Sequence, residues 1–247
     1  MGAGARSTAT WVLVVAGAML FARDADAYRP FDGTDADVAD AGELELELGP
    51  LQAVRTEGAN IYTPALAANY GFSERFELVL DLFGVVPLRA ATGDRMVLSD
   101  VMVKYVLRPG SLQTATGPSI ALETGPLLPN LPAHDTNGAG WSFALIASQR
   151  WSELTVHLTV EGVYERDREV TALASIIVEG PGRWAVRPVA ELLAEHGDDR
   201  ARIGAALVGA IWRVSDRVSF DAAARVERAT DETSVEGRAG LTWTFEP

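Results

Sequence analysis

Residues 153–164 read Glu-Leu-Thr-Val-His-Leu-Thr-Val-Glu-Gly-Val-Tyr, and polar and apolar side chains alternate along most of this stretch. Successive side chains of a β-strand point to opposite sides of the sheet, whereas a helix would scatter the same residues around its circumference. The stretch therefore predicts a strand with one apolar and one polar face. The apolar face holds Leu154, Val156, Leu158 and Val160, and the polar face holds Glu153, Thr155, His157, Thr159 and Glu161.

The same alternation recurs along the chain after residue 42 and predicts an all-β protein of about twelve strands. The apolar face appears on every strand, and the opposite face carries too much charge to pack against a second sheet. This pattern favours a closed antiparallel transmembrane β-barrel over a soluble sandwich, in which the aromatic residues would be ordinary core residues. The expected strands are 43–48, 59–71, 76–83, 96–107, 117–127, 140–148, 153–164, 170–179, 183–195, 200–212, 218–227 and 233–245.

Composition excludes several classes of protein. The 247 residues are 48% hydrophobic, which is too apolar for a disordered chain. There is no cysteine, so disulfides and thiolate metal sites are excluded, and the three histidines (His134, His157 and His196) are too few to suggest a histidine-based metal centre. We therefore expect no metal and no cofactor. The net charge of −13 argues against a nucleic-acid partner, because phosphates bind to basic surfaces.

The N-terminus has the features of an export signal. Arg6 precedes an apolar run from Trp11 to Ala22, and Ala25-Asp26-Ala27 offers a cleavage site between small residues. Residues 1–27 are therefore expected to be a cleaved signal peptide, with an N-terminal membrane anchor as the alternative. Combined with the barrel, this predicts a protein of the cell outer membrane with lipid as its surroundings.

The predicted domains after the signal are an irregular lead-in, residues 28–42, and the barrel, residues 43–247. The connections after strands two, six, eight and ten are short, and most of the others are longer and more polar, as expected for periplasmic turns and outer loops. Both termini should then lie in the periplasm. Aromatic residues near the short turns, such as Trp151 and Trp212, predict an interfacial girdle.

The inward face of such a barrel would be lined by charged residues of both signs. Twelve tilted strands leave an opening of roughly 10 Å between side chains. The lead-in is too short for a folded plug domain but could enter the periplasmic mouth. Because the first strand is next to the last in a closed barrel, Glu43, Glu45 and Glu47 could meet Arg238. The other expected lumen-lining residues are Glu77, Asp81, Asp100, Lys104, Glu123, His157, Glu161, Arg183, Arg187, Glu191, Arg202, Asp221, Arg225, Glu236 and Arg238.

These inward charges have two interpretations. They are either a network of salt bridges that fills the barrel, or the wall of a polar conduit for small solutes.

Short segments near the start of the chain and at two turns carry a family resemblance. They are Tyr28-Arg29-Pro30-Phe31, Asp35-Ala36, Gly42-Glu43-Leu44-Glu45, the turn at 70–78 (Tyr-Gly-Phe-Ser-Glu-Arg-Phe-Glu-Leu) and the turn at 213–218 (Arg-Val-Ser-Asp-Arg-Val). They resemble the outer-membrane proteins grouped as the MetA-pathway of phenol degradation (transporter) family. This resemblance implies a β-barrel over residues 28–247 and, for some members, uptake of aromatic or other hydrophobic compounds. It implies no catalytic residues.

Three functions remain open from the sequence. The first is a channel or transporter for small molecules, and it is the one that the charged inner face favours. The second is a phospholipase-like barrel enzyme, which needs a nucleophile near a base such as His157; no Gly-x-Ser-x-Gly motif is present, and we expect no enzyme. The third is a structural barrel whose loops bind partners. The oligomeric state is not predicted.

Overall fold

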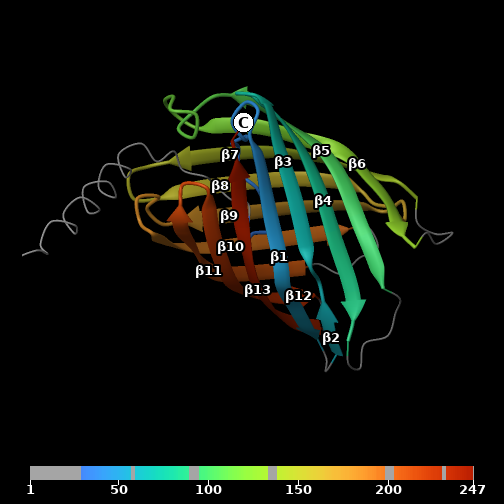
Figure 1. Cartoon of the computed structure of the whole chain (residues 1–247). Helices are drawn as coiled ribbons and strands as arrows, with labels where there is room; N and C mark the ends of the chain where they lie inside the picture. The colour runs from blue at the N-terminus through green and yellow to red at the C-terminus, as the bar shows by residue number, and fades with distance from the viewer. Residues whose placement is uncertain are drawn as a thin grey trace, which may run out of the picture.

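A closed antiparallel barrel forms most of the described structure (Figure 1). The computed structural model describes residues 29–56, 59–88, 95–132, 138–197, 203–229 and 232–246. Its strands are β1 (Leu44–Thr56), β2 (Ala59–Tyr62), β3 (Ala65–Ser73), β4 (Phe76–Pro87), β5 (Met96–Arg108), β6 (Ser119–Leu131), β7 (Gly140–Arg150), β8 (Thr155–Tyr164), β9 (Val170–Glu179), β10 (Val186–Gly197), β11 (Ile203–Ser215), β12 (Val218–Ala229) and β13 (Glu232–Phe245).

From β4 to β13 each strand pairs with the next one in sequence, and β13 pairs with β1, which closes the sheet. The short strands β2 and β3 both pair with β1 on one side and with β4 on the other, so together they occupy one strand position. The barrel therefore has twelve strand positions, and the predicted closed twelve-stranded antiparallel barrel is confirmed.

The polarity of the wall is the reverse of that in a soluble protein. Along β8, His157 and Thr159 are each only 2% exposed, whereas Leu158 is 49% and Val160 is 62% exposed. Polar side chains therefore face the interior and apolar ones face outward, as the alternation of residues 153–164 predicts. No helix in the described part of the chain is long and apolar enough to cross a membrane.

The first strand is longer than predicted. We expected Gly49-Pro50 to end it at Leu48, but β1 continues to Thr56 and pairs with β13 along most of its length. The register shifts between Leu48 and Leu51, and this irregularity accommodates Pro50, which has no N–H to donate to the ladder. The connection between β1 and β2 is therefore residues 57–58 alone, which is shorter than the predicted loop.

Prolines also lie at differences in the limits of two other strands. The predicted strand 59–71 is interrupted at Thr63-Pro64, where the Pro64 carbonyl accepts a hydrogen bond from the Gly84 N–H of β4. In contrast, β6 runs through Pro126 and Pro129 to Leu131, with a register shift against β5 in that region. The predicted strand 183–195 begins only at Val186.

One end of the barrel carries the connections β3–β4, β7–β8, β9–β10 and β11–β12. Exposed aromatic residues cluster there, and Phe72 packs with Phe76, Trp212 with Phe220, and Trp243 with Phe245. We expected the connections at the other end to be longer. This holds only in part, because two connections at that end are short: residues 57–58 join β1 to β2, and residues 230–231 join β12 to β13. The predicted signal peptide, residues 1–27, lies outside the described residues.

Candidate functional site

The lead-in crosses the interior of the barrel. Its described part, residues 29–42, precedes β1 and contacts inward-facing side chains of strands around the wall. Several of these side chains lie in the half of their strand nearest the short turns, among them Glu77 of β4, Ser148 of β7 and Asp221 of β12. The prediction that this segment could enter a mouth of the barrel is therefore realised more extensively than expected.

Backbone amides of the lead-in are bound by the wall. Glu191 accepts hydrogen bonds from the N–H groups of Asp32 (2.9 Å) and Gly33 (2.7 Å). The Ala36 N–H donates to the Ser148 hydroxyl at 2.9 Å, and the Ala39 N–H donates to Glu77 at 2.5 Å. Hydrogen bonds to charged acceptors contribute about 1.5–3 kcal/mol each, so these carboxylates fix the path of an otherwise irregular segment.

Charged side chains of the lead-in also form ion pairs with the wall. Asp32 contacts both Arg225 and Arg238 at 2.6 Å. Arg29 contacts Asp221 at 3.3 Å, and its backbone N–H donates to Glu47 at 3.0 Å. The lead-in is thus tied by ion pairs to β12 and β13, on the side of the barrel where the sheet closes.

Lys104 of β5 is the central cation on the other side of the interior. It is fully buried, and its ammonium lies 3.7 Å from Glu77, 3.6 Å from Glu123 and 4.0 Å from Asp35 of the lead-in. It also donates to the Thr34 hydroxyl at 3.2 Å. One ammonium therefore compensates carboxylates from the wall and from the lead-in together.

The lead-in approaches the wall closely where glycine permits it. A Cβ atom at Gly71 of β3 would overlap the carbonyl oxygens of Ala39 and Asp40, and one at Gly33 would overlap the Ser175 hydroxyl of β9. The Gly42 N–H donates to the Gly71 carbonyl at 2.7 Å, which fixes the lead-in just before it enters β1. Larger residues at these two positions would require the segment to move.

Most of the predicted inward residues lie on the inner side of their strands. The buried ones are Glu77, Lys104, His157, Arg187, Glu191, Asp221, Glu236 and Arg238, and the half-buried ones are Asp81, Asp100, Glu123, Glu161 and Arg225. That they line a transport pathway stays a prediction. Arg202 lies outside the described residues, as does His134.

Two expectations differ from the structure. Arg183 is exposed in the β9–β10 turn, where its guanidinium pairs with Glu153 at 2.5 Å, because β10 begins only at Val186. Arg238 pairs with Glu236 of its own strand and with Asp32, rather than with the glutamates of the first strand. Asp32 of the lead-in thus supplies Arg238 with the carboxylate that we expected β1 to provide. Glu47 of β1 instead accepts a hydrogen bond from the Arg29 N–H.

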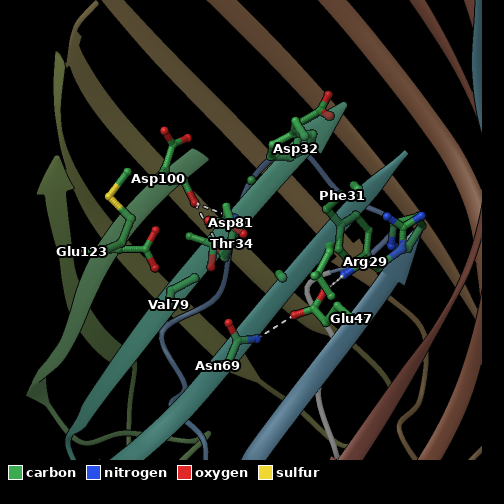
Figure 2. A pocket seen from close by; sticks show the side chains of 18 of the residues that line it. Arg29, Phe31, Asp32, Thr34, Glu47, Asn69, Val79, Asp81, Asp100 and Glu123 are labelled. Atoms are coloured by element: carbon green, nitrogen blue, oxygen red, sulfur yellow. Dashed lines mark hydrogen bonds between the residues drawn. The ribbon is translucent and has the colours of Figure 1, made fainter. Parts of the chain in front are cut away.

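A cavity of about 320 Å³ lies inside the barrel between the lead-in and the wall formed by β1, β3, β4, β5, β6, β7, β8 and β13 (Figure 2). Residues 29–34 of the lead-in line it on one side. Figure 2 shows Asp81, Asp100 and Glu123 together on one side, and Arg29 with Asp32 on the other. The cavity is large enough for a small organic molecule.

The interior also holds a serine next to a histidine. The Ser148 hydroxyl lies 2.9 Å from Nδ1 of His157, and Nε2 of His157 lies 3.9 Å from Glu179. This resembles the residue types of a hydrolytic triad, but the Ser148 oxygen already accepts the Ala36 N–H, and neither Ser148 nor His157 lines the cavity. Ser148 therefore binds the lead-in, and His157 holds the Ser148 hydroxyl.

The uncharged polar residues that bind the lead-in or line the cavity were not identified from the sequence. Asn69 and Ser148 lie at inward positions of β3 and β7, and the alternation of those strands is the signal that could have identified them. The roles of Arg29 and Asp32 had no such signal, because their partners are almost 200 residues away in the sequence.

No family model matches the chain, and no curated protein matches it. Solved structures do match. An outer membrane channel from Pseudomonas putida F1 superposes with a TM-score of 0.63 at 12% identity, covering 87% of this chain and 100% of that one. KdgM porin in complex with disordered oligogalacturonate superposes with a TM-score of 0.56 at 12% identity, covering 83% of this chain and 99% of that one. The translocator domain of autotransporter NalP from Neisseria meningitidis superposes with a TM-score of 0.51 at 10% identity, covering 85% of this chain and 91% of that one.

At these identities the likeness shows the fold and not the activity. The chain has the fold of porin-like outer-membrane β-barrels, and channels for small molecules are among the proteins that share it.

Proposed function

We propose that the protein is an outer-membrane channel for small molecules and that its own lead-in narrows the lumen. The observation that carries the proposal is the polar interior of a closed barrel whose outer surface is apolar. Such a wall is stable in lipid and provides an aqueous path through it. In this orientation the short-turn end, where β1 begins and β13 ends, faces the periplasm.

The resemblance to the phenol-degradation transporter family supports the same function and adds aromatic or other hydrophobic compounds as cargo. The likeness to the Pseudomonas putida channel supports a channel over an enzyme. The Ser148–His157 pair is the feature that favours an enzyme, and its occupation by the Ala36 N–H argues against hydrolysis.

The test is single-channel conductance in planar bilayers. The full protein is compared with a variant that lacks residues 30–39, and the segment 40–43 that joins the lead-in to β3 and β1 is retained. We expect small or infrequent conductance steps from the full protein and larger, longer-lived steps from the deletion variant. The reason is that the deleted residues occupy the interior.

An Asp216→Ala variant serves as a control, because Asp216 is exposed in the β11–β12 turn and should leave conductance unchanged. A folded deletion variant that remains silent would refute a channel. Equal conductance of the two proteins would refute closure by the lead-in.

A further inference from the structure

The cavity beside the lead-in has an excess of negative charge. Its guanidinium groups, from Arg29 and Arg238, are both engaged by carboxylates: Arg29 contacts Asp221, and Arg238 contacts Asp32 and Glu236. They are therefore not available to neutralise the opposite side. The carboxylates that line the cavity are Asp32, Glu47, Asp81, Asp100, Glu123 and Glu161.

Asp81 is the cavity carboxylate whose charge is not compensated by the described residues. Asp100 pairs with Arg166, Glu123 with Lys104, and Glu161 accepts from Ser142. For Asp81, the described residues provide neither a hydrogen bond nor an ion pair. It is half-buried, and it lies directly opposite Asp100 in the β4–β5 ladder. Arg166 compensates the charge of Asp100 and not that of Asp81, and like charges at opposed positions of neighbouring strands destabilise the pairing.

Asn69 is an independent second observation at the same cavity. Its side chain is only 1% exposed, its amide nitrogen donates to Glu47 at 2.8 Å, and its carbonyl oxygen Oδ1 has no hydrogen-bond partner among the described residues. Figure 2 shows Asn69 on the cavity side of β3, close to Val79. Asn69 is opposite Val79 in the β3–β4 ladder, so it is a diagonal neighbour of Asp81. A buried carbonyl without a donor is costly and is satisfied by a ligand that brings one.

The cavity also has an apolar part. Phe31 of the lead-in, Val79 of β4 and Met102 of β5 line it, and the last two belong to one buried apolar cluster. Among the described residues no group of His, Cys, Asp or Glu side chains is arranged to hold a metal ion. The cation that fits is therefore one attached to an apolar body rather than a bare metal.

We propose that this cavity is a binding site for a small organic cation, a primary ammonium or amidinium on an aromatic or alkyl body. Its cationic group contacts Asp81 and Asp100 and donates to Asn69, and its apolar part lies against Phe31, Val79 and Met102. As a class of cargo, this rests on the proposed channel function.

The test is isothermal titration of the full protein, folded in detergent, with benzylammonium. Benzyl alcohol and benzoate serve as probes of the same body without the positive charge. We expect saturable binding of benzylammonium, and at least about tenfold weaker binding of the other two, because neither can form an ion pair with the carboxylates. Benzyl alcohol binding as tightly as benzylammonium would overturn the proposal, as would the absence of saturable binding.

Two variants test the site itself. Asp81→Asn should weaken benzylammonium binding by about tenfold or more. Ala67→Lys places an ammonium opposite Asp81 in the β3–β4 ladder and should abolish binding while keeping the carboxylate, so it also serves if Asp81→Asn does not fold. The matched control is Asp216→Asn, which removes an exposed carboxylate and should leave the affinity unchanged.

Unchanged affinity in both folded cavity variants would overturn the site. This measurement is independent of conductance: a protein that conducts but does not bind benzylammonium refutes only the cation site. One that binds benzylammonium but never conducts refutes only the channel.

Discussion

Lys104 shows how a single buried residue organises the interior. It is fully buried and lies within 4.0 Å of Glu77, Glu123 and Asp35. Its position was predicted from the alternation of β5, because Lys104 lies between the apolar outward residues Val103 and Tyr105. The partner Asp35 was not predicted, since nothing in an aperiodic lead-in indicates which strand it will meet.

Lys104→Met should destabilise the protein by about 3–5 kcal/mol, because removing one member of a buried charge group leaves the others uncompensated. Unfolding by urea in the presence of lipid vesicles measures this. Arg217→Met is the control, because Arg217 pairs with Glu246 on the exposed surface and should change stability little. Equal stability of the Lys104 variant and the wild type would show that the carboxylates do not need this ammonium.

At the scale of the strand, the alternating pattern predicts well that a segment is a strand and which of its faces points inward. It predicts less well where the strand begins and ends. The polar face of β8 is inside and its apolar face is outside, as residues 153–164 predict. The errors occur at prolines: Pro50 does not end β1, and Pro126 does not end β6. Register irregularities accommodate a proline within a strand, and they depend on the partner strand, which local sequence does not specify.

Arg183 lies in an exposed turn and not at the inward position that we predicted, and this has a measurable consequence at two neighbouring turns. Its guanidinium binds both carboxylate oxygens of Glu153, at 2.5 and 2.8 Å, and so joins the β9–β10 turn to the β7–β8 turn. This hydrogen bonding lowers the pKa of Glu153 below its ordinary value of 4.5. A lowered pKa means that the contact stabilises the folded protein above pH 4.5, and that this contribution is lost as the pH falls through the lowered value.

The prediction is checked by NMR titration of the Glu153 carboxyl carbon. The wild-type midpoint should lie below 4.5, and Arg183→Gln should return it toward that value. A midpoint that does not respond to the substitution would show that the two turns are not joined in solution.

For the whole molecule, the closed sheet and its apolar outer surface predict the contact with lipid. Trp151, Trp184, Trp212 and Trp243 are all about half exposed and lie at or near the short-turn end. Tryptophan prefers the boundary between lipid tails and headgroups, so these four should form one edge of the membrane contact.

Fluorescence quenching by brominated lipids tests this arrangement. Bromine near the ester end of the acyl chain should quench strongly, and bromine near the terminal methyl should quench weakly. The reverse order would place this ring in the centre of the bilayer, and no quenching at all would contradict a membrane location for the outer surface.

The seam between β1 and β13 joins segments from opposite ends of the chain, and Leu44 lies across from Phe245. Until those two segments meet, each presents an unpaired edge. The residues just ahead of β1 are already enclosed once they have met. Contacts between this tail and the closing strands, such as those of Asp32 with Arg225 and Arg238, therefore favour the sealed cylinder, so the contents of the protein help to hold its own seam shut.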